Sequence, residues 1–503
     1  MTDFEPFGRH VFADGTYRES KSPESMDVID PATEKPVGSV AVCDSEEVET
    51  IIDEAVETQS SWATEPAATR AAALHGIADS IEAADFERLA TLMTSEHGKP
   101  YPEAEGELAN VAGIFRYYAE LARDDQGNVP GSTQAESFQF DRAFPYGVTV
   151  HITPSNFPVL LTAWTVAASL AAGNAVVVKP SEQTPLSTLQ FMHHFQGLPD
   201  GLVSCLTGRG ETAQAMIQSD GTDAVAFTGG VETGRNVSTA AGQQLMPAVI
   251  EAGGNDPLIV TEHAPVDVAI AGSTTAAFHL SGQVCTSAER FYVHDTVYDE
   301  FVDGLTEMTT ELRIGNGFDS SEIGPLVSEA ARDNVARLVD DALEKGATLE
   351  CGGRVPPNQE TGWFYEPTVL TDVTAEMAIV REEVFGPVAP ICRVESFEEA
   401  LSEANDSEFG LGASVFTTDL EEAMRAYETL AAGMVWINNP MIDNDAIPFG
   451  GWKHSGIGRE LGRQGLDAFR QTKMGVIDWN PQVQDWWYPY PTEWFYDTTD
   501  KRF

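Results

Sequence analysis

One cysteine of the chain stands among small and polar neighbours, in the stretch 278–290 with the sequence FHLSGQVCTSAER. Packing of an apolar core does not require a cysteine in that setting, and an ionised thiol is a strong nucleophile. An inert buried thiol is the alternative interpretation for any unpaired cysteine. We take Cys285 as a candidate nucleophile, whose role depends on what other residues can supply.

Asn156 is a candidate partner for that nucleophile. It follows the segment 147–152, whose alternating pattern predicts a strand, and it is expected to open a helix over 156–172. The start of a helix carries unpaired N–H groups, and an asparagine amide adds a donor that could hold a developing oxyanion. A simple helix cap is the alternative role.

Glu251 is the second candidate partner. It directly follows the apolar segment 248–250 and precedes the flexible pair Gly253 and Gly254. A partly buried glutamate has a raised pKa and can act as a general base near neutral pH. The alternative is a structural carboxylate at a strand end.

A lysine and a glutamate follow the apolar segment 175–178, which predicts a buried strand. Ligands of open α/β sheets bind beyond the carboxyl ends of the strands, so Lys179 and Glu182 could reach ribose hydroxyls there. A carboxylate in that place repels a 2′-phosphate, which favours NAD over NADP. A surface ion pair is the alternative interpretation.

Glycines spaced G-x-x-x-x-G follow another predicted strand, in the stretch 226–234 with the sequence AFTGGVETG. The pattern resembles a dinucleotide-binding turn, although it lacks the usual G-x-G-x-x-G, and it predicts phosphate contact at a helix start. Close strand–helix packing is the alternative reason for these glycines.

The elements that must position these residues alternate along the chain. After a short polar lead-in, helical patterns cover 45–57, 67–83 and 104–122. From residue 146 short strands alternate with helices, as in a parallel doubly wound sheet, and a second such block begins near 254. The chain ends in a segment rich in aromatic residues and proline, over 479–496, that is expected to pack on another surface.

Composition excludes several classes of protein. The formal charge of −50 would repel nucleic acid and anionic membranes. The five cysteines are far apart and the histidines are not clustered, which argues against a disulfide framework and against a metal site. No apolar run has the length of a bilayer span and the start of the chain does not resemble a signal peptide, so we expect a cytoplasmic protein.

Taken together, these motifs and two later loops resemble the NAD(P)-dependent aldehyde dehydrogenase superfamily, in order and spacing, over about residues 25–478. The motifs that carry the resemblance are GQVC with Cys285, NFP with Asn156, KPSE from Lys179, FTG from Phe227, ExGG from Glu251, ExFGP from Glu383, and PFGGxKxSGxGRE from Pro448. The sequence departs from common family patterns at Ser155, Gly230 and Leu280, and none of these departures removes a chemical role.

The resemblance implies the role of each motif. Cys285 would attack the aldehyde, Asn156 and the Cys285 N–H would hold the oxyanion, and Glu251 would activate the water that releases the acid. Lys179 and Glu182 would bind the adenosine ribose of NAD, with NADP as the other possible cofactor. The cofactor-binding positions implied are Ile152, Thr153, Lys179, Ser181, Glu182, Phe227, Gly229, Gly230, Thr233, Gly234, Glu383 and Phe385.

Positions expected to line the aldehyde tunnel are mostly apolar, with Asp443 and Asp445 nearby and no arginine to bind a carboxylate. The sequence therefore favours an aliphatic or aromatic aldehyde over a carboxylated semialdehyde. The expected tunnel residues are Phe157, Leu161, Trp164, Val284, Thr286 and Phe449.

The resemblance also implies an α/β fold of two doubly wound α/β domains with a small β oligomerisation arm, assembled as a homodimer or homotetramer. The expected NAD-binding domain comprises 1–124 and 147–253, and the catalytic domain 254–453. The arm and the aromatic C-terminal tail are expected in 125–146 and 454–503.

Other function classes fit the sequence less well. A CoA-acylating dehydrogenase shares the fold but does without a water-activating glutamate, which Glu251 supplies here. A cysteine hydrolase needs a histidine beside its nucleophile, and His279 is the near one in sequence. A catalytically silent binding protein would tolerate loss of the candidate catalytic residues, and this chain retains all of them.

The excess of acidic residues, 79 against 29 basic ones, predicts a halophilic protein that needs salt to stay folded. Salt at 1 M shortens the Debye length to about 3 Å and screens the repulsion. We expect the melting temperature, followed by circular dichroism, to rise steeply between dilute buffer and molar KCl. Equal stability at both salt concentrations would contradict the hypothesis.

Overall fold

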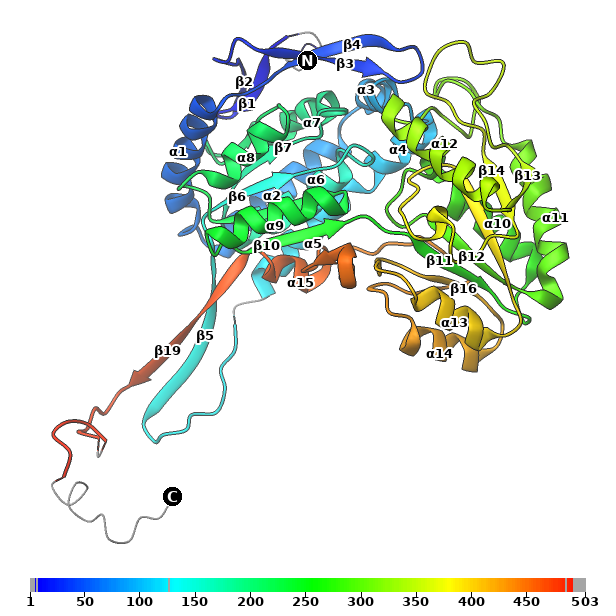
Figure 1. The fold of residues 1–503 in the computed structure, drawn as a ribbon. Helices are drawn as coiled ribbons and strands as arrows, with labels where there is room; N and C mark the ends of the chain where they lie inside the picture. The colour runs from blue at the N-terminus through cyan, green and yellow to red at the C-terminus, as the bar shows by residue number, and fades with distance from the viewer. Residues whose placement is uncertain (1–4, 6–7, 125–126, 485, 492–503) are drawn as a thin grey trace, which may run out of the picture. The chain divides into compact units, whose positions relative to one another are not determined.

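The computed structural model describes residues 5, 8–124, 127–484 and 486–491 (Figure 1). The described residues form two compact units, the larger within 1–124 and 145–470 and the smaller within 125–144 and 471–503. Within the described part of the chain, no helix combines the length and apolarity that crossing a membrane requires.

The larger unit contains an eight-stranded sheet whose central strands, β10 to β8 in the order below, run parallel. The strands are, in spatial order, β18 (Gly456–Ile457), β10 (Ala248–Ala252), β9 (Ala224–Gly229), β6 (Val148–Ile152), β7 (Ala175–Lys179), β8 (Val203–Cys205), β1 (His10–Ala13) and β2 (Thr16–Glu19). The outer strands β18, β1 and β2 run antiparallel to their neighbours. Strands β6 and β7 are buried throughout, as expected for a parallel sheet covered on both faces.

Helices flank this sheet, with α8 and α9 on one side and α2, α5 and α6 on the other (Figure 1). Helix α6 is apolar around its whole circumference, which is typical of a helix buried between other elements. The helices of this region are α1 (Ser45–Trp62), α2 (Ala67–Glu82), α3 (Glu87–His97), α4 (Tyr101–Ala109), α5 (Val111–Asp124), α6 (Leu160–Ala172), α7 (Pro185–Phe191), α8 (Gly210–Gln218), α9 (Val231–Gln243) and α15 (Gly462–Asp467).

A second sheet of seven strands lies in the same unit, and all its pairings except that of β13 with β14 are parallel. Its spatial order is β13 (Thr348–Cys351), β14 (Thr368–Thr371), β15 (Val388–Val394), β12 (Ala288–His294), β11 (Asp256–Val260), β16 (Ser414–Phe416) and β17 (Trp436–Ile437). Its helices are α10 (Val266–Phe278), α11 (Asp295–Glu311), α12 (Glu329–Glu344), α13 (Phe397–Asn405) and α14 (Leu420–Thr429). The predicted second α/β block is therefore present.

A two-stranded sheet of β5 (Ser137–Pro145) and β19 (Arg470–Asp478) forms the main element of the smaller unit. Several apolar side chains of this unit are largely exposed, among them Met474 at 78%, Trp479 at 62% and Tyr488 at 82%. The part of the expected aromatic tail beyond residue 491 lies outside the described residues.

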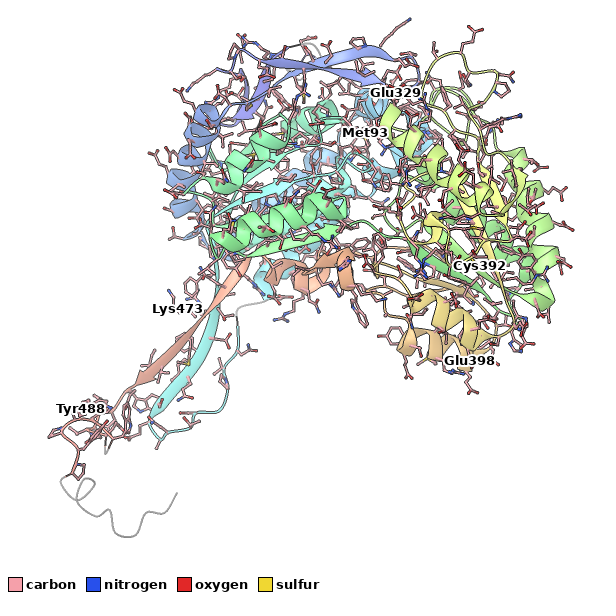
Figure 2. All side chains as sticks on the ribbon, in the orientation of Figure 1. Met93, Glu329, Cys392, Glu398, Lys473 and Tyr488 are labelled. Carbon is pink, nitrogen blue, oxygen red and sulfur yellow. The ribbon has the colours of Figure 1, made fainter. Side chains whose placement is uncertain are left out.

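Acidic side chains are also exposed along both sheets' outer helices. Figure 2 marks two of them, Glu329 at the start of α12 and Glu398 on α13. Each lies beside a partly exposed arginine, and surface pairs of this kind contribute little to stability. The predicted need for salt stays a prediction.

Two local predictions were wrong. The helix expected over 156–172 begins only at Leu160, because Pro158 disfavours helical backbone at the residue before it. The helix expected over 104–122 is two helices, α4 and α5, separated at Asn110, whose side-chain amide bonds the Gly106 carbonyl.

Two broader differences concern the ends of the chain. The polar lead-in contains β1, β2 and the hairpin of β3 (Ser25–Asp30) and β4 (Lys35–Ala41). β1 and β2 are only four residues long, so each leaves little periodic signal. Residues 454–470, predicted to belong with the arm and tail, fall in the larger unit because β18 pairs with β10.

Candidate active site

The carboxyl ends of the parallel strands open into one cavity of about 580 Å³. β6 ends at Ile152, β7 at Lys179, β9 at Gly229 and β10 one residue after Glu251, and all four residues line the cavity. Cys285, which comes from the loop before β12 of the second sheet, lines it as well. The cavity thus collects residues from both sheets of the larger unit.

The loop that carries Cys285 has an unusual backbone. It follows the 3-10 helix η2 (His279–Gly282), in which Leu280 and Ser281 have positive φ angles of 50° and 57°. Such angles are strained for residues with a side chain and persist only where the surroundings hold them. Gln283 supplies part of that support, because its side chain accepts from Val327 N at 2.8 Å and donates to the Leu280 carbonyl at 3.1 Å.

Two glycines let the loop pack against its neighbours. A Cβ at Gly254 would lie 2.2 Å from the Cys285 carbonyl oxygen, and a Cβ at Gly282 would lie 2.2 Å from the Gly386 carbonyl oxygen. Both distances are far below van der Waals contact. Only glycine fits at these two positions without a shift of backbone.

Asn156 lies against the same loop. Its Nδ2 donates to the Gln283 carbonyl at 3.0 Å, and its Oδ1 accepts from Phe157 N at 3.0 Å. The side chain is buried and lines the cavity. Because an amide nitrogen has two N–H groups, one remains for a ligand beside Cys285.

A buried ion pair that the sequence analysis missed holds the segment around Asn156. Lys99 Nζ lies 2.7 Å from Glu107 Oε2, and both side chains are fully buried. Lys99 also donates to the Asn156 carbonyl, while Glu107 Oε1 accepts from Val159 N at 2.9 Å and Leu160 N at 3.0 Å. The glutamate therefore caps the start of α6, and the pair is satisfied by backbone groups as buried charges must be.

Glu251 is buried and incompletely hydrogen-bonded. Its Oε2 accepts from Gly451 N at 3.3 Å, and its Oε1 has no hydrogen-bond partner. Burial raises the pKa of this carboxyl well above its usual range, and the neighbouring Glu460 raises it further. An oxygen without a partner in a buried carboxylate is free to bind a water or a ligand proton.

Glu460 also lines the cavity, although the sequence analysis gave it no role. Its Oε1 accepts from the Thr228 hydroxyl at 3.3 Å, its Oε2 has no partner, and burial raises its pKa to about 8. The residue belongs to the GRE motif that contributed to the family resemblance. Its place in that motif is the feature of the sequence that could have indicated a role for Glu460.

The structure brings most of the predicted residues together. Every expected catalytic and cofactor residue except Gly234 lines the cavity, which also includes Gln183, Gly210, Ala213, Asn334 and Leu411. Gly234 lies inside α9, where a Cβ would meet the side chain of Ile250 at 3.1 Å. Helix–strand packing explains this glycine.

The expected tunnel residues divide into two groups. Leu161 and Phe449 line the cavity, whereas Phe157, Trp164, Val284 and Thr286 are not among its lining residues. Trp164 packs edge-on against Phe449, with ring centroids 4.9 Å apart. Val284 and Thr286 are buried on either side of Cys285.

The surroundings of Cys285 oppose ionisation of its thiol. Burial raises the pKa of Cys285 well above its usual range, and the carboxyl groups of Asp256, Glu383, Asp443 and Glu251 raise it further. No group of three or more histidine, cysteine, aspartate or glutamate side chains in the described residues is arranged to hold a metal ion.

The chain is similar in sequence and in structure to known aldehyde dehydrogenases. The family model described as "Aldehyde dehydrogenase family" matches residues 17–474. A chloroplastic aminoaldehyde dehydrogenase of Arabidopsis thaliana is 38% identical over 93% of this chain and 96% of its own length, and a betaine aldehyde dehydrogenase of Brucella canis is 36% identical over 94% and 99%. A solved betaine aldehyde dehydrogenase of Staphylococcus aureus, in complex with NAD+, superposes with a TM-score of 0.92 at 35% identity, covering 95% of this chain and 96% of that one.

The chain belongs to the aldehyde dehydrogenase family. It is an oxidoreductase that acts on aldehydes, and the predicted family, fold class and reaction class are confirmed. NAD, the predicted cofactor, is the one bound in the Staphylococcus aureus enzyme.

The raised pKa of Cys285 predicts how its alkylation depends on pH. Iodoacetamide should modify Cys285 of the free protein slowly at pH 7 and progressively faster above pH 9, because only the thiolate reacts. Asp256→Asn removes a negative charge that raises the thiol pKa, so it should move the profile to lower pH. Mass spectrometry of the labelled peptide measures both rates.

Asp445→Asn is the matched control, because it removes the same charge at a position that is not among the main causes of the raised Cys285 pKa, and it should shift the profile much less than Asp256→Asn. A wild-type profile that levels off below pH 8 would contradict the prediction.

Proposed function

We propose that the protein oxidises an aldehyde to its carboxylic acid with NAD, using Cys285 as the nucleophile. The observation that carries the proposal is the meeting of Cys285, Asn156 and Glu251 in one cavity, although they come from different elements. The Cys285 thiol gives its proton to a base in the cavity, for which Glu251 is the candidate and from which the proton passes on to solvent before the hydrolysis step. The resulting thiolate adds to the carbonyl carbon to form a thiohemiacetal. The oxyanion then accepts a hydrogen bond from the remaining Asn156 N–H, which favours the charge as it develops.

NAD, when bound, accepts the hydride that leaves the thiohemiacetal carbon. The residues present fit a dinucleotide: Lys179 ends β7, Glu182 lies just beyond it, and the open position Gly230 precedes α9. Glu383 and Phe385 would hold the nicotinamide half at the other side of the cavity. The negative charge of the Glu182 carboxylate would repel the 2′-phosphate of NADP, which favours NAD as the cofactor.

Loss of the hydride leaves an acyl thioester on Cys285, which water must hydrolyse. Glu251 is the general base for this step, because burial raises the pKa of its carboxyl and so makes the carboxylate a stronger base, and because its Oε1 is available. Water adds to the thioester carbon, the C–S bond breaks, and the thiolate and the acid are released. A glutamate in this place also argues against transfer of the acyl group to CoA.

We infer that the preferred aldehydes carry a positively charged amino or ammonium group. The named relatives act on aminoaldehydes and betaine aldehyde, and among the described lining residues of the cavity Lys179 is the one basic side chain. Phe449 lines the cavity with its ring packed edge-on against Trp164, and the Asp443 carboxyl lies near enough to Cys285 to raise the pKa of its thiol. Aromatic faces and carboxylates together favour a cation.

We also propose that the protein assembles as a homodimer or homotetramer in the cytoplasm. The exposed apolar side chains of the smaller unit suit burial against another copy of the chain, and light scattering would report a dimer or tetramer as a multiple of 54.4 kDa. The described cysteines form no disulfide, which is typical of a reducing compartment such as the cytoplasm.

Glu251→Gln separates hydride removal from hydrolysis. The variant should release one equivalent of NADH per active site in a rapid burst and then turn over about a hundredfold more slowly, because the thioester is no longer hydrolysed efficiently. Stopped-flow absorbance at 340 nm measures the burst. Cys285→Ala, the control, should show neither burst nor turnover while still binding NAD, and an unchanged steady-state rate in Glu251→Gln would remove the residue from this role.

A matched pair of substrates tests the charge preference. Betaine aldehyde and 3,3-dimethylbutanal have nearly the same shape and differ in a quaternary nitrogen against a carbon. We expect kcat/KM to be about tenfold higher for the cation, which corresponds to about 1.4 kcal/mol of cation–π and carboxylate attraction. Equal values for the two, or a higher value for succinic semialdehyde, would contradict the inference.

A further inference from the structure

A second buried glutamate lies just after the nucleophile loop. Glu289 is the second residue of β12, four residues after Cys285, and only 2% of it is exposed. It does not line the cavity, and the reaction described above does not use it. A carboxylate removed from water is costly unless its oxygens are hydrogen-bonded, so its partners indicate why it is there.

The carboxylate of Glu289 accepts hydrogen bonds from two successive backbone groups. Its Oε2 accepts from Val384 N at 2.9 Å, and its Oε1 accepts from Phe385 N at 2.8 Å. Successive N–H groups that converge on one anion form a nest, which binds a carboxylate with a fixed geometry. Glu289 thus holds the backbone of the segment that carries Glu383 and Phe385 into the cavity.

A third donor fixes the carboxylate itself. Asn255 Nδ2 donates to Glu289 Oε2 at 3.0 Å and to the Glu382 carbonyl at 3.1 Å. The asparagine precedes β11, so three separate segments of the chain meet at this carboxylate. No hydrogen bond from a lysine or arginine to Glu289 occurs among the described residues, and its oxygens are bound by neutral donors alone.

The backbone that Glu289 holds is strained. Phe385 has a positive φ of 48°, in the left-handed region that residues with a side chain seldom adopt. The conformation directs a half-buried aromatic residue into the cavity lining. Strain of this kind persists when surrounding contacts determine it, and the hydrogen bond from Phe385 N to Glu289 is such a contact.

We propose that Glu289 is a positioning residue for hydride transfer, which keeps Phe385 and Glu383 in place against the nicotinamide half of NAD. The proposal rests on the function proposed above. Glu289 touches neither substrate nor cofactor, and it acts through the backbone of 384–385. The Gly282 and Gly386 backbones are in contact, so the segment that Glu289 holds also lies against the Cys285 loop. This contact sets the distance between that segment and the nucleophile.

Glu289→Gln tests the proposal, because a glutamine has one acceptor oxygen and its amide group would face at least one of the backbone donors. We expect kcat for aldehyde oxidation at saturating NAD to fall by about tenfold or more. The affinity for ADP-ribose, which lacks the nicotinamide, should stay within about twofold of wild type by calorimetry. Hydrolysis of p-nitrophenyl acetate without NAD, which needs Cys285 but no hydride transfer, should also stay within about twofold.

Glu96→Gln is the matched control. Glu96 is likewise buried and accepts from two successive backbone groups, Leu186 N at 2.8 Å and Ser187 N at 2.9 Å, but it lies outside the cavity lining. The Glu96→Gln variant should lower the melting temperature about as much as Glu289→Gln does, and it should leave kcat near that of wild type. If Glu289→Gln does not fold, Glu289→Asp keeps the charge but reaches one backbone donor fewer, and the same pattern is expected.

An unchanged kcat in the Glu289 variants would overturn the proposal, and so would a parallel loss of ester hydrolysis and ADP-ribose binding, which indicates general disruption. Failure of the proposed function is a separate result, because then the wild-type protein itself would not reduce NAD with any aldehyde.

Discussion

The short connection 253–255 between β10 and β11 is the constraint on which the site depends. It joins the two sheets, and it does so with two glycines because the backbone has no room for side chains. A Cβ at Gly253 would lie 2.1 Å from Glu383 Oε2, and a Cβ at Gly254 would lie 2.2 Å from the Cys285 carbonyl oxygen. Glu251 lies near the end of β10, just before this connection. The connection therefore brings the general base, the nucleophile and the glutamate on the nicotinamide side close together.

Buried or half-buried carboxylates held by backbone N–H groups recur around this contact. Glu107 caps the helix after Asn156, Glu289 holds the segment of Phe385, and Glu383 accepts from Gly254 N at 3.1 Å. Each hydrogen bond repays part of the cost of removing a charge from water, yet burial still raises the pKa of Glu383 to about 8 and that of Glu289 to about 7. Burial, together with nearby carboxyl groups, raises the pKa of the Cys285 thiol, and a protonated thiol reacts more slowly with electrophiles than a thiolate does.

The sequence was sufficient for the residues that belong to linear motifs. Cys285, Glu251, Asn156 and the cofactor positions other than Gly234 all line the predicted cavity, and both parallel sheets were expected from the alternation of strands and helices. The supporting residues could not be found in this way, because their roles come from contacts between distant segments. Glu289 and Val384 are 95 residues apart, and Lys99 and Asn156 are 57 apart.

The late start of α6 has the same explanation. The pattern of apolar residues extends back to Asn156, but Pro158 and the distant carboxylate of Glu107 set the first turn at Leu160. The strands β1 and β2 were missed because a strand of four residues carries little periodicity.

The glycine contacts around Cys285 also limit how the pocket can change. Because Gly254 and Gly282 bring backbone against backbone, the nucleophile loop cannot be displaced to admit a bulkier or differently shaped substrate. New specificity, whether acquired by natural divergence or by protein engineering, has to come from side chains that face the cavity without bearing on this contact, such as Leu161 and Phe449. The catalytic geometry and the choice of substrate are therefore separable, and a library of variants confined to those side chains would explore substrates without dismantling the chemistry.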